Sequence, residues 1–99
     1  MRKNKNRPKY RDIKSHIFNG KRYVVKWVRD RNGIGCCLPP DAKLKAIHIN
    51  PDLDPRTLLG VICHESLHAL EWNLSEEFVE EAAESIAELL WKANFRLIE

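Results

Sequence analysis

The feature that most constrains this chain is the segment His-Glu-Ser-Leu-His at residues 64–68, which is embedded in an otherwise apolar run. On a helix, residues four apart lie one above the other, so His64 and His68 can direct two imidazoles at one metal ion. Glu65 can then reach a water molecule on that metal. This is the H-E-x-x-H arrangement of zinc-dependent hydrolases. The sequence therefore predicts a packed amphipathic helix that carries a zinc site.

An alternative interpretation is that His64 and His68 are ordinary surface residues one turn apart. That interpretation does not explain why three polar residues interrupt an apolar helix, whereas a metal site does.

Length and composition limit what can surround this helix. The chain has 99 residues, enough for one hydrophobic core but not for two. No apolar run approaches the ~20 residues that span a bilayer, so no membrane partner is expected. The charged N-terminus is not followed by the apolar stretch of a secretory signal, which favours a cytoplasmic location. The three cysteines are an odd number and are expected to be thiols rather than a disulfide framework.

Charge is unevenly distributed along the chain, although the net charge is only +3. We expect residues 1–11 to form a flexible basic tail and residues 12–99 to form a single domain. Nucleic-acid binding by the tail ranks last among the functional hypotheses, because its charges do not alternate with aromatic residues that could stack on bases. The basic residues concerned are Arg2, Lys3, Lys5, Arg7, Lys9 and Arg11.

The first half of the domain has the pattern of a small sheet. Asn19 and Gly20 separate two β-branched and aromatic runs, which predicts two antiparallel strands joined by a type I′ turn. A second turn is expected at 30–33. A short strand at 35–38, stopped by two prolines, and a further strand at 44–49 complete the predicted sheet.

The second half of the domain is predicted to be a helical hairpin. Asp54 and Pro55 suit the start of a helix that runs to Trp72. Ser75 suits the cap of a second helix, in which apolar residues recur over about five turns. We therefore expect an α+β fold, in which a small antiparallel or mixed sheet precedes a zincin-like helical hairpin.

The third zinc ligand is expected from the second helix. A catalytic zinc usually takes three protein ligands, and no histidine follows His68. In an antiparallel hairpin the two histidines should lie level with residues 78–84, where Glu80, Glu81 and Glu84 qualify.

An apolar face centred between Phe78, Ile86 and Ala93 would place Glu81 and Glu77 on one flank, and the expected hand of the hairpin favours Glu81. Glu77, Glu80, Glu84 and the strand residue His48 remain alternatives.

Three groups of residues carry a family resemblance that covers roughly residues 22–97. They are Ala46-Ile47-His48-Ile49, His64 to Ala69, and Glu76-Glu77-Phe78-Val79, followed by the pairs Ile86-Ala87, Leu90-Trp91 and Phe95-Arg96. With these features the chain resembles the small HExxH proteins of phages and prophages, which are similar to minimal gluzincin peptidases. The resemblance implies one zinc per chain held by both histidines and a glutamate of the next helix.

The resemblance also implies a function. A zinc-dependent metallopeptidase would hydrolyse a peptide or protein substrate with a zinc-bound water and Glu65 as general base, in the host cytoplasm if the protein is phage-encoded. Tyr23 and His48 are the candidates, by strand order, for an oxyanion donor. Thermolysin-like enzymes place an aspartate four residues after the ligand glutamate, where this chain has Ser85 if the ligand is Glu81. The alternative function is a non-catalytic, zinc-stabilised protein-binding or regulatory module of phage origin.

Overall fold

A computed structural model describes residues 10–29, 35–38 and 44–97. Three predicted features lie outside the described residues: residues 1–9 of the expected tail, the expected turn at 30–33 and the two prolines at 39–40. The elements in chain order are a 3-10 helix (Tyr10–Asp12), β1 (Ser15–Phe18), β2 (Lys21–Trp27), β3 (Gly35–Cys37), β4 (Ala46–Ile49), α1 (Pro55–Leu70) and α2 (Glu76–Lys92).

The first two strands form the expected hairpin. Phe18 pairs with Lys21 across the turn, and the chain between them passes through Asn19 and Gly20 with φ of 50° and 80°. Two successive positive φ values are what a type I′ turn requires, and its twist matches that of the flanking strands. The predicted antiparallel hairpin is confirmed.

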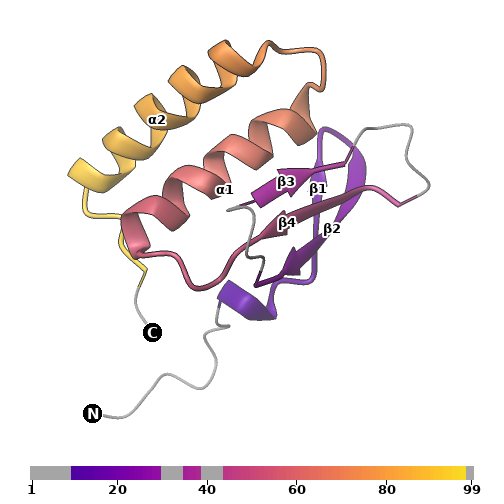
Figure 1. The fold of residues 1–99 in the computed structure, drawn as a ribbon, viewed down its shortest axis with the longest axis horizontal. Helices are drawn as coiled ribbons and strands as arrows, with labels where there is room; N and C mark the ends of the chain where they lie inside the picture. The colour runs from indigo at the N-terminus through magenta and orange to yellow at the C-terminus, as the bar shows by residue number, and fades with distance from the viewer. Residues whose placement is uncertain (1–9, 30–34, 39–43, 98–99) are drawn as a thin grey trace.

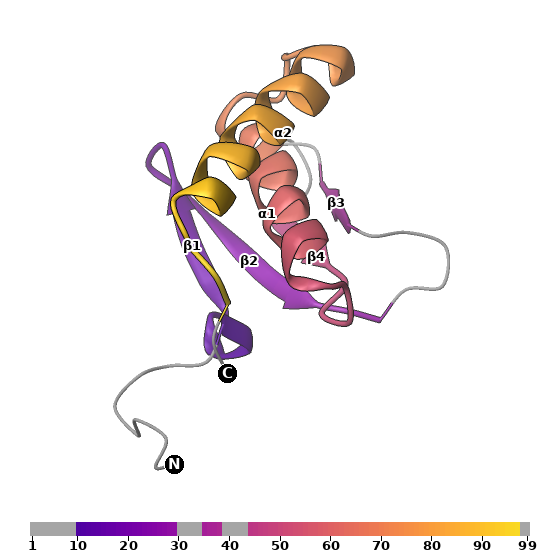
Figure 2. The same ribbon diagram turned by 90° about the vertical axis from the view of Figure 1, so that its left-hand side faces the viewer.

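The sheet is mixed, with strand order β1-β2-β4-β3. β2 and β4 are parallel, whereas β1 pairs with β2 and β3 pairs with β4 in the antiparallel sense. Helix α1 packs against one face of this sheet, and α2 packs on the outer side of α1 (Figure 1, Figure 2). The expected α+β architecture, a small mixed sheet followed by a helix pair, is confirmed.

Helix α1 begins where the sequence predicts and ends two residues early, at Leu70 rather than Trp72. The Asp54 carboxylate accepts a hydrogen bond from the backbone N–H of Thr57 at 3.1 Å, and Pro55 occupies the first turn. This cap satisfies an N–H that has no partner within the helix.

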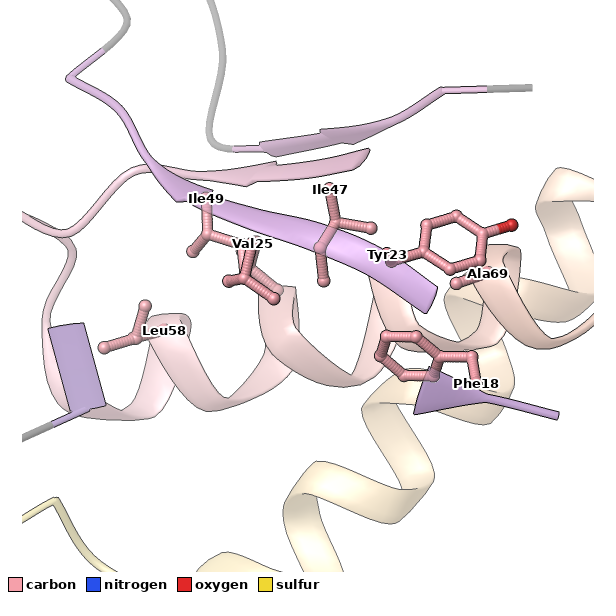
Figure 3. Packing of buried hydrophobic residues seen from close by; sticks show 8 residues of the cluster. Phe18, Tyr23, Val25, Ile47, Ile49, Leu58 and Ala69 are labelled. Carbon is pink, nitrogen blue, oxygen red and sulfur yellow. The ribbon is translucent and has the colours of Figure 1, made fainter. Parts of the chain in front are cut away.

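The core lies between α1 and the sheet. Its buried side chains are Phe18, Tyr23, Val25, Ile47, Ile49, Leu58, Val61 and Ala69, most of which are labelled in Figure 3. Full burial of one large apolar side chain stabilises a fold by about 1.5–3 kcal/mol. This packing is therefore what fixes α1, and with it the histidine pair, relative to the sheet.

Helix α2 begins after Ser75, whose hydroxyl accepts a hydrogen bond from the backbone N–H of Phe78 at 3.1 Å. Its buried residues are Val79, Ala83 and Ala87. The predicted apolar face centred between Phe78, Ile86 and Ala93 is therefore wrong, and 52% of Phe78 and 43% of Ile86 is exposed. Small side chains allow α2 to approach α1 closely, so they take the buried face.

Tyr10 and Arg11, which the sequence places in the tail, form part of the 3-10 helix. The Tyr10 hydroxyl donates to the Pro51 carbonyl at 3.1 Å, and its ring packs edge-on against Trp27 with centroids 5.1 Å apart. Tyr10 therefore belongs to the folded domain. No helix in the described part of the chain is long and apolar enough to cross a membrane.

Candidate metal centre

One carboxylate contacts both histidines of the motif. Glu76 Oε1 lies 2.7 Å from His64 Nε2, and Glu76 Oε2 lies 3.0 Å from His68 Nε2. The two imidazole rings are 4.9 Å apart between centroids. Within the described residues, these three side chains are the group whose ligand atoms all lie within 4.8 Å of one another. We refer to them as the His64–His68–Glu76 cluster.

The motif residues come together as expected, but the carboxylate that joins them is not the expected one. Glu76 lies on the same face of α2 as the buried residues Val79 and Ala83, and this face is turned toward α1. Glu81 is exposed and is not part of the cluster. The expectation for Glu81 depended on an apolar face of α2 that differs from the buried face, so Glu76 was not among the residues expected to lie level with the histidines.

The other residues considered as ligands or oxyanion donors also lie apart from the cluster. Glu84 forms an ion pair with Arg56, and Glu77 and Glu80 are exposed. His48 alternates with the core residues Ile47 and Ile49, so its side chain is directed to the sheet face away from α1. Tyr23 is 1% exposed and packs in the core.

Glu65 is buried on the sheet side of α1 with 5% of its surface exposed. Its Oε1 has no hydrogen-bond partner among the described residues. Burial raises the pKa of this carboxyl to about 7; His64 opposes the rise and Glu76 adds to it. A carboxyl group with this pKa exchanges protons near neutral pH.

Strand β3 approaches this carboxylate very closely at Gly35. A Cβ at Gly35 would lie 2.8 Å from Val61 Cγ1, 3.0 Å from the His48 carbonyl oxygen and 3.3 Å from Glu65 Oε2. Only glycine permits that approach. Gly35 therefore brings the edge of the sheet against α1, a role that the sequence alone did not indicate.

Two grooves meet at Gly35, His64 and Glu65. The Arg56 groove, of about 630 Å³, continues along the start of α1 to Arg56, Gly60, Glu80 and Glu84.

The Trp72 groove, of about 410 Å³, continues past His68 and Glu76 to Trp72 and Leu74. The cluster is therefore accessible from these two open grooves. A metal site that keeps one coordination position for a substrate must be accessible in this way.

The donor set fits zinc. Two imidazole nitrogens and one carboxylate are a known ligand set of catalytic zinc. Tetrahedral ligands about 2.0–2.1 Å from a metal are roughly 3.3 Å apart, and one ligand atom of each of the three side chains lies within 4.8 Å of the other two. The Glu76 side chain is exposed, so it is free to adjust its position.

The second ring nitrogen of His68 also bears on this site. His68 Nδ1 is buried and has no hydrogen-bond partner among the described residues. Ligand histidines usually donate this second ring N–H to an acceptor, which orients the ring and strengthens binding.

A sequence signal for Glu76 did exist. The alanines at 83 and 87, at helical spacing with Val79, mark the side of α2 that can approach another helix closely, and Glu76 continues that face by one turn.

Comparison with protein-family models, with curated proteins and with solved structures finds no match to this chain.

Proposed function

We propose that this chain is a zinc-dependent metallopeptidase in which His64, His68 and Glu76 hold one zinc ion and Glu65 is the general base. The observation that carries the proposal is the buried Glu65 carboxylate, with its pKa raised to about 7, beside a cluster of three zinc-type ligands. General bases act best when their pKa lies near the working pH. The cytoplasmic location expected from the sequence is part of this proposal.

Zinc in this cluster would supply Lewis acidity, which polarises a carbonyl and lowers the pKa of water to about 7. Glu65 would accept a proton from the attacking water and deliver it to the leaving amine. No described residue bonds to its Oε1, which leaves this oxygen to accept that proton. β3 is one of the two edge strands of the described sheet and lines both grooves through Gly35, so an extended peptide could pair along it.

The proposal is tested by Glu65→Gln, which keeps the size of the side chain and removes its basicity. Zinc content should stay at one per chain, while hydrolysis of a mixed peptide library, followed by mass spectrometry, should fall by at least ~10². His64→Ala is the matched control and should lose both zinc and hydrolysis. Equal hydrolysis by the wild type and Glu65→Gln would refute the role of Glu65.

A non-catalytic, zinc-stabilised binding module is the second candidate. It is favoured by the apolar surface of α2, where Phe78, Ile86 and Leu89 are 52%, 43% and 67% exposed. Exposed apolar patches often mark protein interaction sites. Full zinc occupancy without turnover of any library peptide would favour this function over the peptidase.

A further inference from the structure

The two helices of the hairpin meet in a regular register along the Arg56 groove. His64 contacts Glu76 near one end of the groove, and Arg56 contacts Glu84 at the other. Arg56 and His64 are separated along α1 by as many residues as Glu76 and Glu84 are along α2. The residues midway between them are Gly60 on α1 and Glu80 on α2, and both line the groove.

Glu80 is the unpaired member of a carboxylate column. Glu76, Glu80 and Glu84 recur at every fourth residue, so they lie one above the other on α2. Like charges at this spacing destabilise a helix. Glu76 contacts the imidazoles and Glu84 contacts Arg56, but Glu80 has no hydrogen bond or ion pair with any residue in the described ranges.

α1 leaves space opposite Glu80. A Cβ at Gly60 would meet only the end of the Arg56 side chain, at 3.5 Å, so packing does not require glycine there. Glycine within a helix is destabilising relative to alanine. The absence of a side chain at Gly60 leaves room in the groove at the level of Glu80.

A second, independent observation points into the same groove. Glu65 lines it, is only 5% exposed, and has an Oε1 without a hydrogen-bond partner in the described part of the chain. Because Arg56 and Glu84 neutralise each other, Glu80 is the carboxylate of this groove that has no countercharge among the described residues. An occupant that carries positive charge would compensate it.

We propose that the Arg56 groove binds a positively charged group of the peptide substrate, a Lys or Arg side chain or a free amino terminus, through Glu80. This inference rests on the proposed peptidase function. Glu80 would be a specificity-determining residue: it contacts the substrate away from the bond that is cleaved. A neutral or acidic group in the same place would leave Glu80 uncompensated, so the preference is for cationic peptides.

Glu80 has one competing role that the test must separate. It lies four residues after Glu76, the spacing at which thermolysin-like enzymes place the aspartate that orients a ligand histidine. If Glu80 orients His64, Glu80→Gln should lower zinc affinity and weaken every peptide equally. If Glu80 recognises charge, the same change should leave zinc affinity unaltered and weaken cationic peptides alone.

Binding can be measured without hydrolysis in zinc-loaded protein that carries Glu65→Gln. The probes are three fluorescent peptides of one length: an acetylated peptide with a single Lys, its acetylated Gln counterpart, and the Gln peptide with a free amino terminus. Anisotropy titrations would compare this protein with the additional changes Glu80→Gln and Glu88→Gln. Glu88 is the matched control, because it lies on α2 outside both grooves and pairs with Lys92.

At least one cationic peptide should bind about fivefold or more tightly than the neutral peptide. Glu80→Gln should remove that preference and Glu88→Gln should retain it. A preference for the Lys peptide identifies a side-chain site, and a preference for the free amine identifies an amino-terminal site; both support the inference.

Equal binding of all three peptides, no binding, or equal effects of the two substitutions would overturn it. Hydrolysis by the wild type without any charge preference would refute this inference alone. Charge-selective binding by the Glu65→Gln protein, together with no hydrolysis of these peptides by the wild type, would instead refute the peptidase function.

Discussion

At the scale of single residues, Glu65 is the buried charged side chain of the described part of the chain. A carboxyl group that is only 5% exposed and whose Oε1 has no partner among the described residues is costly to ionise, and the rise of its pKa to about 7 expresses that cost. Buried unpaired carboxyl groups persist where function needs them. The position of Glu65 between β3 and the His64–His68–Glu76 cluster gives a reason for its retention.

This raised pKa has a consequence for stability. The folded state of the metal-free protein holds the Glu65 proton up to a pH of about 7, whereas the unfolded chain releases it near 4.5. Stability should therefore fall as pH rises through this window, by roughly 3 kcal/mol from this group, and level off above it.

Urea denaturation of chelator-treated wild type and Glu65→Gln between pH 4.5 and 8 measures the difference. The variant should lack this decline and be the more stable protein at pH 8. Identical pH profiles for the two proteins would show that Glu65 is not a protonated buried acid.

At the scale of secondary-structure elements, the two N-caps have different relations to the site. Ser75 caps the turn of α2 that contains Glu76, whereas Asp54 caps the far end of α1. Both caps use a side-chain oxygen that accepts a backbone N–H at 3.1 Å. Substitutions at the two caps can therefore separate an effect on helix stability from an effect on zinc binding.

Ser75→Ala should lower the free energy of unfolding by about 1 kcal/mol and also weaken zinc binding, because the first turn of α2 would fray around Glu76. Asp54→Ala should lower stability but leave zinc affinity unchanged. Chemical denaturation and zinc titration of both variants check this. Equal effects of the two substitutions on zinc affinity would mean that the α2 cap does not position Glu76.

Elements specified by local chemistry were predictable from the sequence. The Asn19–Gly20 turn, the caps at Asp54 and Ser75, and the spacing of His64 and His68 each depend on a few neighbouring residues. Such signals act within one turn or hairpin and do not require knowledge of the remaining fold.

Features that depend on packing between distant segments were not predictable in the same way. Glu76 reaches the histidines because Ala83 and Ala87, rather than the larger Phe78 and Ile86, face α1. Hydrophobicity alone favours the larger side chains for burial, and close helix contact favours the smaller ones. The approach of Gly35 to α1 likewise depends on β3 pairing with β4, which no local signal specifies.

At the scale of the whole molecule, the cluster links the end of α1 to the beginning of α2. Among the described elements, α2 has its main contacts with α1, so this helix interface is what chiefly attaches it. A metal bound by residues of both helices would hold the hairpin closed and stabilise the entire domain by linkage.

Zinc at about 100 times its dissociation constant should add about 2.7 kcal/mol to the free energy of unfolding. For a domain of this size that corresponds to a rise in Tm of roughly 10 °C or more. Circular-dichroism melts with zinc and with chelator measure it, and His64→Ala is the control that should show no rise. An equal rise in this control would indicate that zinc binds elsewhere.

The identity of the third ligand tests the account most directly. A chelator-competition titration would determine the zinc affinity of wild type, Glu76→Gln and Glu81→Gln, which remove the same charge from the same helix. We predict that Glu76→Gln weakens zinc binding strongly, since an amide is a poorer ligand than a carboxylate, and that Glu81→Gln binds like wild type. Strong weakening by Glu81→Gln together with wild-type affinity in Glu76→Gln would contradict the proposed metal centre.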